Sequence, residues 1–164
     1  MTHKKQVKYE DGTVYTGDFD VANRVRQGEG HLQLADNSSI RATFVDDLVE
    51  GFGVHTYPNG DIFKGNYSKN MREGRGTLSR SSGSRMQGLW SNNLPNGKGV
   101  EVWRNGTQFK GIFVNGAREG FGTYKFSDGS SYKGQFKGNF FDGAGILKLV
   151  DGRSYDGSWV KGVI

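Results

Sequence analysis

The chain has 164 residues, a net charge of +5, 34% hydrophobic residues, 27 glycines and no cysteine. This composition excludes disulfides, thiolate metal sites and a large compact core, and no stretch approaches the ~20 apolar residues of a membrane-spanning helix. Residues 1–8 are basic and lack the apolar stretch of a secretory signal, so we expect a soluble intracellular chain.

A pair of glycines separated by one residue recurs at intervals of 23 along almost the whole chain. The pairs are Gly28/Gly30, Gly51/Gly53, Gly74/Gly76, Gly97/Gly99, Gly120/Gly122 and Gly143/Gly145. A repeat of this length predicts a small supersecondary unit stacked along an axis, each copy burying its apolar face against its neighbours. We therefore expect function on a surface rather than in a pocket.

A second repeated phrase consists of a large apolar residue, a small residue two positions later and another large residue two after that. The phrase begins at Tyr15, Ile40, Phe63, Met86, Phe109, Tyr132 and Tyr155. These starts are 23 residues apart, except for a step of 25 from Tyr15 to Ile40. The two additional residues lie between Phe19 and Gly28, which predicts a loop in that segment.

Turn residues at the same period predict β-hairpins. They are Asp11-Gly12, Asp36-Asn37, Asn59-Gly60, Ser82-Gly83, Asn105-Gly106, Asp128-Gly129 and Asp151-Gly152. A two-residue loop would scatter the aromatic side chains over both faces, whereas a three-residue loop closed by a left-handed glycine keeps them together. The three-residue loop predicts the pairs Glu101–Phe109, Gly99–Gly111 and Gly97–Phe113. Both glycines of each pair then lie on the aromatic face and leave room for the rings.

The segments 132–136, 142–145 and 151–155 read YKGQF, DGAG and DGRSY, and they closely resemble the MORN (membrane occupation and recognition nexus) repeat. The resemblance covers residues 7–159 and implies an all-β fold, an elongated single-layer antiparallel meander of β-hairpin repeats. About fourteen strands would form a twisted ribbon with open edges.

The resemblance also implies the domain organisation. Residues 1–164 form a single domain with a first strand at 5–10, repeats starting at 15, 40, 63, 86, 109 and 132, and a final half repeat at 155–161. The first two copies depart most from the pattern, since Ile40 replaces the aromatic residue and Ala42 the strand glycine. Such departures are typical of capping repeats.

Basic residues are concentrated in the middle of the chain. Residues 1–63 carry a net charge of −4, residues 64–125 of +8 and residues 126–164 of +1. The basic residues in or beside the loops that join the two strands of a repeat are expected to line one long edge; they are Lys69, Arg72, Arg75, Lys98 and Arg118. Such a stripe would attract anionic lipid headgroups or an acidic protein partner.

The sequence contains no catalytic signature. The spacing from Gly60 to Gly65 imitates part of a P-loop, but Asn66 follows where the lysine of that motif belongs. His31 and His55 are expected to face opposite sides of the sheet, so no metal triad is predicted. We predict a non-enzymatic chain with no cofactor and no metal site.

Two classes of function follow. The favoured class is a scaffold that holds a helix or an extended segment of a partner protein on the aromatic face, with anchors at Trp90, Trp103, Phe109, Phe113, Tyr124 and Phe126. The family resemblance implies a cytoskeletal or ciliary component, such as part of an axonemal radial-spoke head. The alternative is a peripheral membrane adaptor that binds acidic phospholipids through the basic stripe.

Further expectations concern partners and location. An open edge strand offers a place for a second copy of the chain to pair, and nucleic acid is not an expected partner. The expected location is the cytoplasm, at the cytoskeleton or cilium in the scaffold class and at the membrane periphery in the alternative.

Overall fold

The structure is a computed structural model that describes residues 2–163, and every helix or strand assigned there is a β-strand. The fourteen strands are β1 (Thr2–Lys8), β2 (Val14–Asp20), β3 (Val25–Gln33), β4 (Ser39–Val45), β5 (Leu48–Thr56), β6 (Ile62–Ser68), β7 (Met71–Ser79), β8 (Arg85–Ser91), β9 (Leu94–Val102), β10 (Gln108–Val114), β11 (Ala117–Lys125), β12 (Ser131–Lys137), β13 (Phe140–Lys148) and β14 (Ser154–Trp159). No helix able to cross a membrane occurs in this part of the chain.

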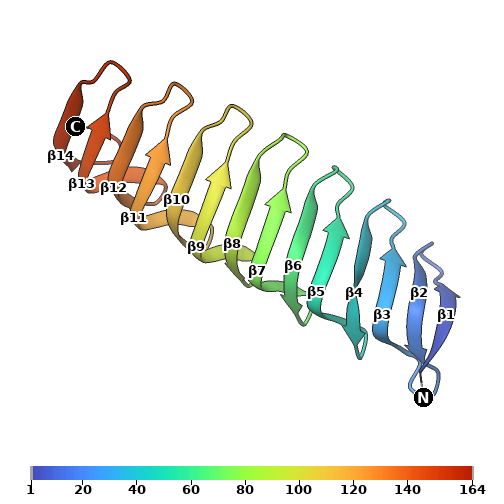
Figure 1. Ribbon diagram of the computed structural model, residues 1–164. Helices are drawn as coiled ribbons and strands as arrows, with labels where there is room; N and C mark the ends of the chain where they lie inside the picture. Colours follow the sequence, from blue (N-terminus) through green and yellow to red (C-terminus); the bar gives the residue numbers. More distant parts are fainter. Residues whose placement is uncertain (1, 164) are drawn as a thin grey trace. The chain divides into compact units, whose positions relative to one another are not determined.

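The chain divides into two compact units, residues 1–81 with β1–β7 and residues 82–164 with β8–β14. Within each unit the strands follow one another in chain order and pair antiparallel with their neighbours (Figure 1). The predicted all-β antiparallel meander of about fourteen strands is confirmed. The assignment of residues 1–164 to a single domain stays a prediction.

The register across the three-residue loops agrees with the sequence analysis. In β9 and β10, Glu101 pairs with Phe109, Gly99 with Gly111 and Gly97 with Phe113. The loop between them closes with hydrogen bonds from the Thr107 side, where the Trp103 amide donates to the Thr107 carbonyl at 2.8 Å, and from Gly106, whose φ is +86°. The predicted loop type is therefore confirmed.

The opposite ends of the hairpins are closed by tighter turns. Asn115-Gly116, between β10 and β11, has φ values of +47° and +85°, which is the pattern of a two-residue type I′ turn. The β2–β3 connection is the exception, because residues 21–24 form a longer turn in which the Asp20 carboxylate accepts a hydrogen bond from the Ala22 amide at 2.9 Å. The predicted loop between Phe19 and Gly28 is confirmed.

Side chains from one repeat hold the two-residue turn of the next. The Glu119 carboxylate accepts a hydrogen bond from the Gly138 amide at 2.7 Å, and the Asn139 side chain accepts one from the Arg118 amide at 2.8 Å. Glu50 and Asn70 make the same reciprocal pair of bonds in the first unit, at 2.8 Å and 2.7 Å. This ladder satisfies backbone donors at the hairpin ends and ties each repeat to its neighbour.

The second glycine of each pair makes room for a ring, as predicted. A Cβ atom at Gly122 would lie 2.6 Å from the Phe109 ring, and one at Gly111 would also lie 2.6 Å from it. Real Cβ atoms do not approach that closely, so the ring can cover the strand only where glycine is present.

The first glycine of each pair has a different role, and the prediction that it also makes room for rings is wrong. Gly88 and Trp90 are two residues apart on β8, but their partners Gly99 and Pro95 are four apart on β9, so the strand bulges there. Gly97 lies in this bulge with φ +108°, and a Cβ atom on it would point at Leu89, away from the rings. The bulge requires a left-handed backbone, which glycine adopts at low cost.

The core of each unit is a row of rings on one face of its strands. In the second unit it contains Phe109, Phe113, Tyr132, Phe136 and Trp159, all at most 5% exposed. Phe109 and Phe113 meet edge to face with ring centres 5.2 Å apart, and Phe109 meets Phe136 at 4.9 Å. Such edge-to-face pairs add about 0.5–1.5 kcal/mol beyond the burial of apolar area.

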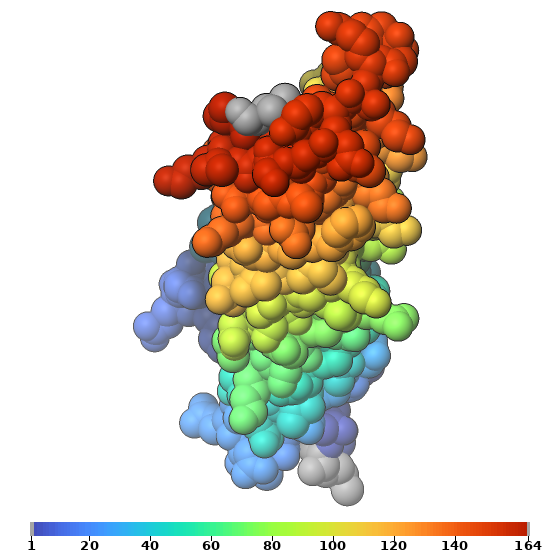
Figure 2. Space-filling view, turned by 90° about the vertical axis from the view of Figure 1, so that its left-hand side faces the viewer, coloured from blue at the N-terminus to red at the C-terminus, as the bar shows by residue number. Residues whose placement is uncertain are grey.

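The first and last strands leave open edges, as expected. β1 pairs only with β2, and β14 pairs only with β13 among the described residues. The C-terminal segment, red in Figure 2, lies at the surface of the second unit. Pairing of a second copy along such an edge stays a prediction.

Candidate functional site

The aromatic face of the second unit combines buried and half-exposed rings. Of the six predicted anchors, Trp90, Phe109 and Phe113 are at most 3% exposed and pack in the core. Trp103, Tyr124 and Phe126 are half-buried and reach the surface. The surface that a partner can touch is therefore built from these last three rings, above a floor made by the others.

The half-exposed rings lie together with a fourth that the sequence analysis did not select. Tyr124 lies 5.7 Å from Trp103, 4.9 Å from Phe126 and 5.9 Å from Phe141, measured between ring centres. Phe141 also stacks on the buried Tyr132 ring at 3.9 Å. We call Trp103, Tyr124, Phe126 and Phe141 the aromatic cluster. Its rings come from the ends of β9 and β11 and from the start of β13.

A single cation lies over the aromatic cluster. The guanidinium carbon of Arg118 is 5.3 Å from the centre of the Trp103 ring and 5.7 Å from that of Tyr124. The Arg118 Nε also donates to the Asn139 side chain at 3.3 Å, which fixes the guanidinium in place. Cation–π contacts of this kind contribute about 0.5–1 kcal/mol when exposed and more when desolvated.

The same repeat position carries an arginine over a ring in the first unit. Arg26 lies 5.1 Å from the centre of the Phe44 ring, and Arg72 lies 5.4 Å from that of Phe63. Phe141 occupies this position in a later repeat, 23 residues after Arg118. The alignment of the repeats would have identified Phe141, since it replaces an arginine that stacks on rings.

The aromatic cluster borders an open hollow of about 390 Å³ at the end of the second unit where the three-residue loops lie. Trp103 and Tyr124 form its apolar wall, and Ser82, Arg104 and Thr107 supply polar groups. The hollow therefore offers ring faces beside hydrogen-bonding side chains, a combination suited to a peptide.

The five basic residues predicted to line one edge are divided between the two faces. Arg72 and Arg118 lie over rings on the aromatic face. Arg75 precedes Gly76, which pairs with Gly65 on the aromatic face, so alternation places Arg75 on the reverse face, and Lys98, before Gly99, is placed there likewise. Lys69 lies in a two-residue turn. The single basic edge is therefore wrong, because position along the strand, and not closeness to a loop, sets the direction of each side chain.

The two histidines face opposite sides, as expected. His31 pairs with Arg41 on the reverse face, and His55 pairs with Phe63 on the aromatic face, where it stacks on Tyr57 at 3.8 Å. Burial lowers the pKa of both imidazoles, and nearby Arg41 and Arg72 lower them further. Between Thr2 and Val163, no three His, Asp or Glu side chains are grouped so that they could hold a metal ion.

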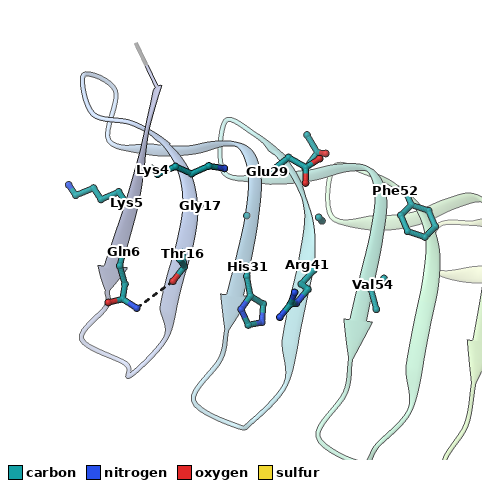
Figure 3. Close-up of a pocket in the computed structure, with 13 residues that line it drawn as sticks. Lys4, Lys5, Gln6, Thr16, Gly17, Glu29, His31, Arg41, Phe52 and Val54 are labelled. Carbon is teal, nitrogen blue, oxygen red and sulfur yellow. Dashed lines mark hydrogen bonds between the residues drawn. The ribbon is translucent and has the colours of Figure 1, made fainter.

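The reverse face of the first unit is hollowed as well (Figure 3). The hollow has a volume of about 760 Å³, and Lys4, His31, Arg41, Glu29 and Phe52 are among its lining residues. Lys4 forms an ion pair with Asp18 at 3.0 Å. Charges of both signs are therefore present on this surface.

Comparisons with known proteins agree with the geometry. The profile of the MORN repeat matches five consecutive segments, residues 42–62, 63–85, 87–108, 109–131 and 132–152. No curated protein matches the chain at a significant level.

Two solved structures share the fold. The chain is similar to the TCP domain of Drosophila melanogaster SAS-4 (dCPAP), solved in complex with a proline-rich motif of Ana2 (dSTIL), with 13% identity, a TM-score of 0.53 and coverage of 95% of this chain and 90% of that chain. It is also similar to the wild-type TCP10 domain of Danio rerio CPAP, with 18% identity, a TM-score of 0.38 and coverage of 96% and 95%. At these identities the likeness concerns the fold alone.

Proposed function

The chain belongs to the MORN-repeat family, and from that premise we propose that it is a non-enzymatic scaffold that binds a segment of a partner protein on its aromatic face. The observation that carries the proposal is the aromatic cluster, four rings on one face of the second unit that are only half-buried. Large aromatic side chains supply much of the binding energy of protein interfaces. In a thin sheet they are expensive to leave exposed to water unless a partner covers them.

The buried rings prepare the surface for binding. Phe109, Phe136 and Trp159 hold the strands beneath the cluster, and Arg118 is fixed by Asn139. A site whose parts are already in place loses little conformational entropy when a partner arrives. Arg118 would meet carbonyl or carboxylate oxygens of the partner, and the rings would meet its apolar side chains.

We favour an extended, proline-containing segment as the partner. Polyproline segments dock on surfaces lined by aromatic rings and keep their preformed conformation in doing so. The TCP domain of SAS-4, which shares the fold, was solved with a proline-rich motif of another protein. A helical segment is the other form of partner that the cluster could hold.

The cellular setting is a separate proposal. Membership of the family supports a cytoskeletal or ciliary component, with a cytoplasmic location. Co-localisation of the tagged protein with axonemal and cytoskeletal markers tests this setting, and a uniformly diffuse signal in ciliated cells would contradict it.

Affinity purification tests the scaffold. The tagged chain is compared with the Trp103→Ala/Phe126→Ala variant, which removes two half-exposed rings and leaves the buried row intact. We expect the double substitution to reduce recovery of the specific partner by about tenfold or more, in line with the loss of interface hot spots.

Phe52→Ala is the matched control, because Phe52 is an exposed ring, at 62%, on the reverse face of the first unit. It should leave recovery unchanged. Unchanged recovery with the Trp103→Ala/Phe126→Ala variant, which must first be shown to be folded, would refute the proposed site.

A further inference from the structure

The reverse face of the second unit carries a surface that the proposed function does not use. An open hollow of about 890 Å³ lies there across β8–β11. Its apolar lining comes from Val100, Val102, Ile112 and Phe121, and Arg85, Lys98 and Lys110 surround them. No acidic side chain lines the hollow. The surface is therefore both apolar and positively charged.

Phe121 is the most exposed ring of this unit, at 58%. It lies between the two glycines of its pair, so alternation points it away from the aromatic core. Its one described ring contact is with Lys133, whose ammonium nitrogen is 5.9 Å from the ring centre. A large ring held in water beside a cation marks an interaction site more often than a structural need.

The cations around the hollow are not neutralised within the unit. Arg85, Lys98, Lys110 and Lys133 are exposed, and none of them forms an ion pair with any residue from Thr2 to Val163. The corresponding surface of the first unit differs, because Asp18 and Glu29 accompany its cations. The charge of the second unit's reverse face therefore calls for an anionic partner.

The spacing of the side chains specifies the form of the partner. Val100, Lys110, Thr123 and Lys133 face one another in a single row across β9, β10, β11 and β12. Neighbouring strands are ~4.8 Å apart, so cations recur about every 10 Å with a smaller side chain between them.

A helix laid across the strands matches this row. Residues on one face of a helix lie at i, i+3 or i+4, and i+7, in steps of roughly 5 Å, so carboxylates two turns apart meet the lysines and apolar residues between them meet Val100 and Thr123. In an extended strand, residues on one face repeat every ~6.8 Å, which does not match. The hollow also suits the convex surface of a helix better than the flat surface of a bilayer.

We propose that the reverse face of the second unit binds an acidic amphipathic helix of a partner protein, with Phe121 and Ile112 in contact with its apolar face and Lys98, Lys110 and Lys133 paired with its carboxylates. This surface is separate from the aromatic cluster, so the chain can hold two partner segments at once, one on each face.

The probe for this proposal is a displayed library of amphipathic helical peptides with Glu, Lys or Gln at each polar position. Selection on the full chain should enrich peptides with Glu at positions seven residues apart. Their affinity for the Lys98→Glu/Lys110→Glu variant and for Phe121→Ser should be about tenfold or more lower, because two charge pairs or the central apolar contact are lost.

The repeats provide matched controls. Arg75, Lys64 and Phe52 occupy the repeat positions of Lys98, Lys110 and Phe121 in the first unit. The Arg75→Glu/Lys64→Glu variant and Phe52→Ser should therefore bind the selected peptides as the unaltered chain does. Equal thermal unfolding midpoints verify that all four variants are folded, which their exposed positions lead us to expect.

Three results would overturn the proposal. The first is a selection without enrichment of Glu. The second is selected peptides whose binding is reduced by Trp103→Ala/Phe126→Ala and not by Lys98→Glu/Lys110→Glu, which would assign them to the aromatic cluster. The third is no acidic peptide selected while phosphatidylserine-containing vesicles sediment with the chain and not with Lys98→Glu/Lys110→Glu, which would make the surface a membrane contact.

Discussion

Arg118 lies over the Trp103 ring, with its guanidinium carbon 5.3 Å from the ring centre. The contact joins β11 to the loop that follows β9, so it holds the exposed edge of the aromatic cluster in place. Arg118→Lys keeps the charge but removes the flat guanidinium that stacks on the ring. We expect the free energy of unfolding to fall by about 0.5–1 kcal/mol and the tryptophan emission to move to longer wavelength as Trp103 becomes more hydrated.

Arg85→Lys is the control for Arg118→Lys, because Arg85 is exposed on the reverse face of the same unit. It should change neither the emission nor the urea midpoint. Identical emission spectra for Arg118→Lys and the unaltered chain would show that the contact does not order Trp103.

Tyr132 and Gly134 form a steric pair that a double-mutant cycle can measure. A Cβ atom at Gly134 would meet the Tyr132 hydroxyl at 2.5 Å. In the second repeat alanine stands at this position as Ala42, and Ile40 stands where the ring belongs. Gly134→Ala should therefore destabilise the chain by about 1–3 kcal/mol, and by less when Tyr132→Ile is also present.

Urea unfolding of the two single variants and the double variant checks this coupling. The exposed Ala144→Ser substitution in the neighbouring strand is the control and should have an effect within about 0.5 kcal/mol of zero. Additive effects of Gly134→Ala and Tyr132→Ile would mean that the backbone of Gly145, not the ring, sets the requirement for glycine.

Tyr67 is the buried tyrosine whose hydroxyl lacks a hydrogen-bond partner in the structure, across residues 2–163. The equivalent positions in other repeats carry Phe44, Phe113 and Phe136. Tyr67→Phe removes a desolvated hydroxyl and should raise the free energy of unfolding by about 1 kcal/mol. Differential scanning calorimetry would show the gain as a higher midpoint.

Tyr132→Phe is the matched comparison for Tyr67→Phe. The Tyr132 hydroxyl donates to the Gln135 carbonyl at 2.9 Å, so its removal should cost about 0.5–1.5 kcal/mol. If both substitutions shift the midpoint downward, the Tyr67 hydroxyl has a partner in solution, such as a bound water molecule.

The buried tyrosines predict a loss of stability in alkali. Burial raises the pKa of Tyr15 to about 12, and the nearby Asp18 carboxylate adds to the shift. An unfolded tyrosine ionises near pH 10, as listed for model peptides in general terms, so the unfolded chain loses its proton first. The stabilising contribution is complete below about pH 10 and is lost as the pH rises toward 12.

Urea titrations between pH 8 and 12 measure this loss, with phenolate absorbance at 295 nm as the readout of ionisation. Tyr15→Phe is less stable at neutral pH, because it lacks the 2.7 Å hydrogen bond from the hydroxyl to the Asp18 carbonyl. Its stability should nevertheless decline less above pH 10. Parallel declines for both proteins would show that Tyr15 does not contribute to the alkaline transition.

Much of the fold follows from local rules in the sequence. The 23-residue period, the three-residue loops and the pairing of Glu101 with Phe109 were all predicted correctly. Side-chain alternation and turn chemistry act over a few residues, so a single repeat contains the information that they need. The faces of Arg118 and Lys98 could have been predicted too, by counting alternate residues back from the second glycine of each pair.

Other features depend on contacts between repeats. The sequence alone determined that the chain is an antiparallel meander of MORN repeats, because hydrophobic alternation and turn residues act locally. Only the tertiary structure decided which anchors are available. Phe109 is covered by Phe113 and Phe136 from the same and the next repeat, whereas Trp103 and Tyr124 stay half-exposed. Burial depends on how side chains of successive repeats fill the space above each strand, and that sum over neighbours is fixed by packing.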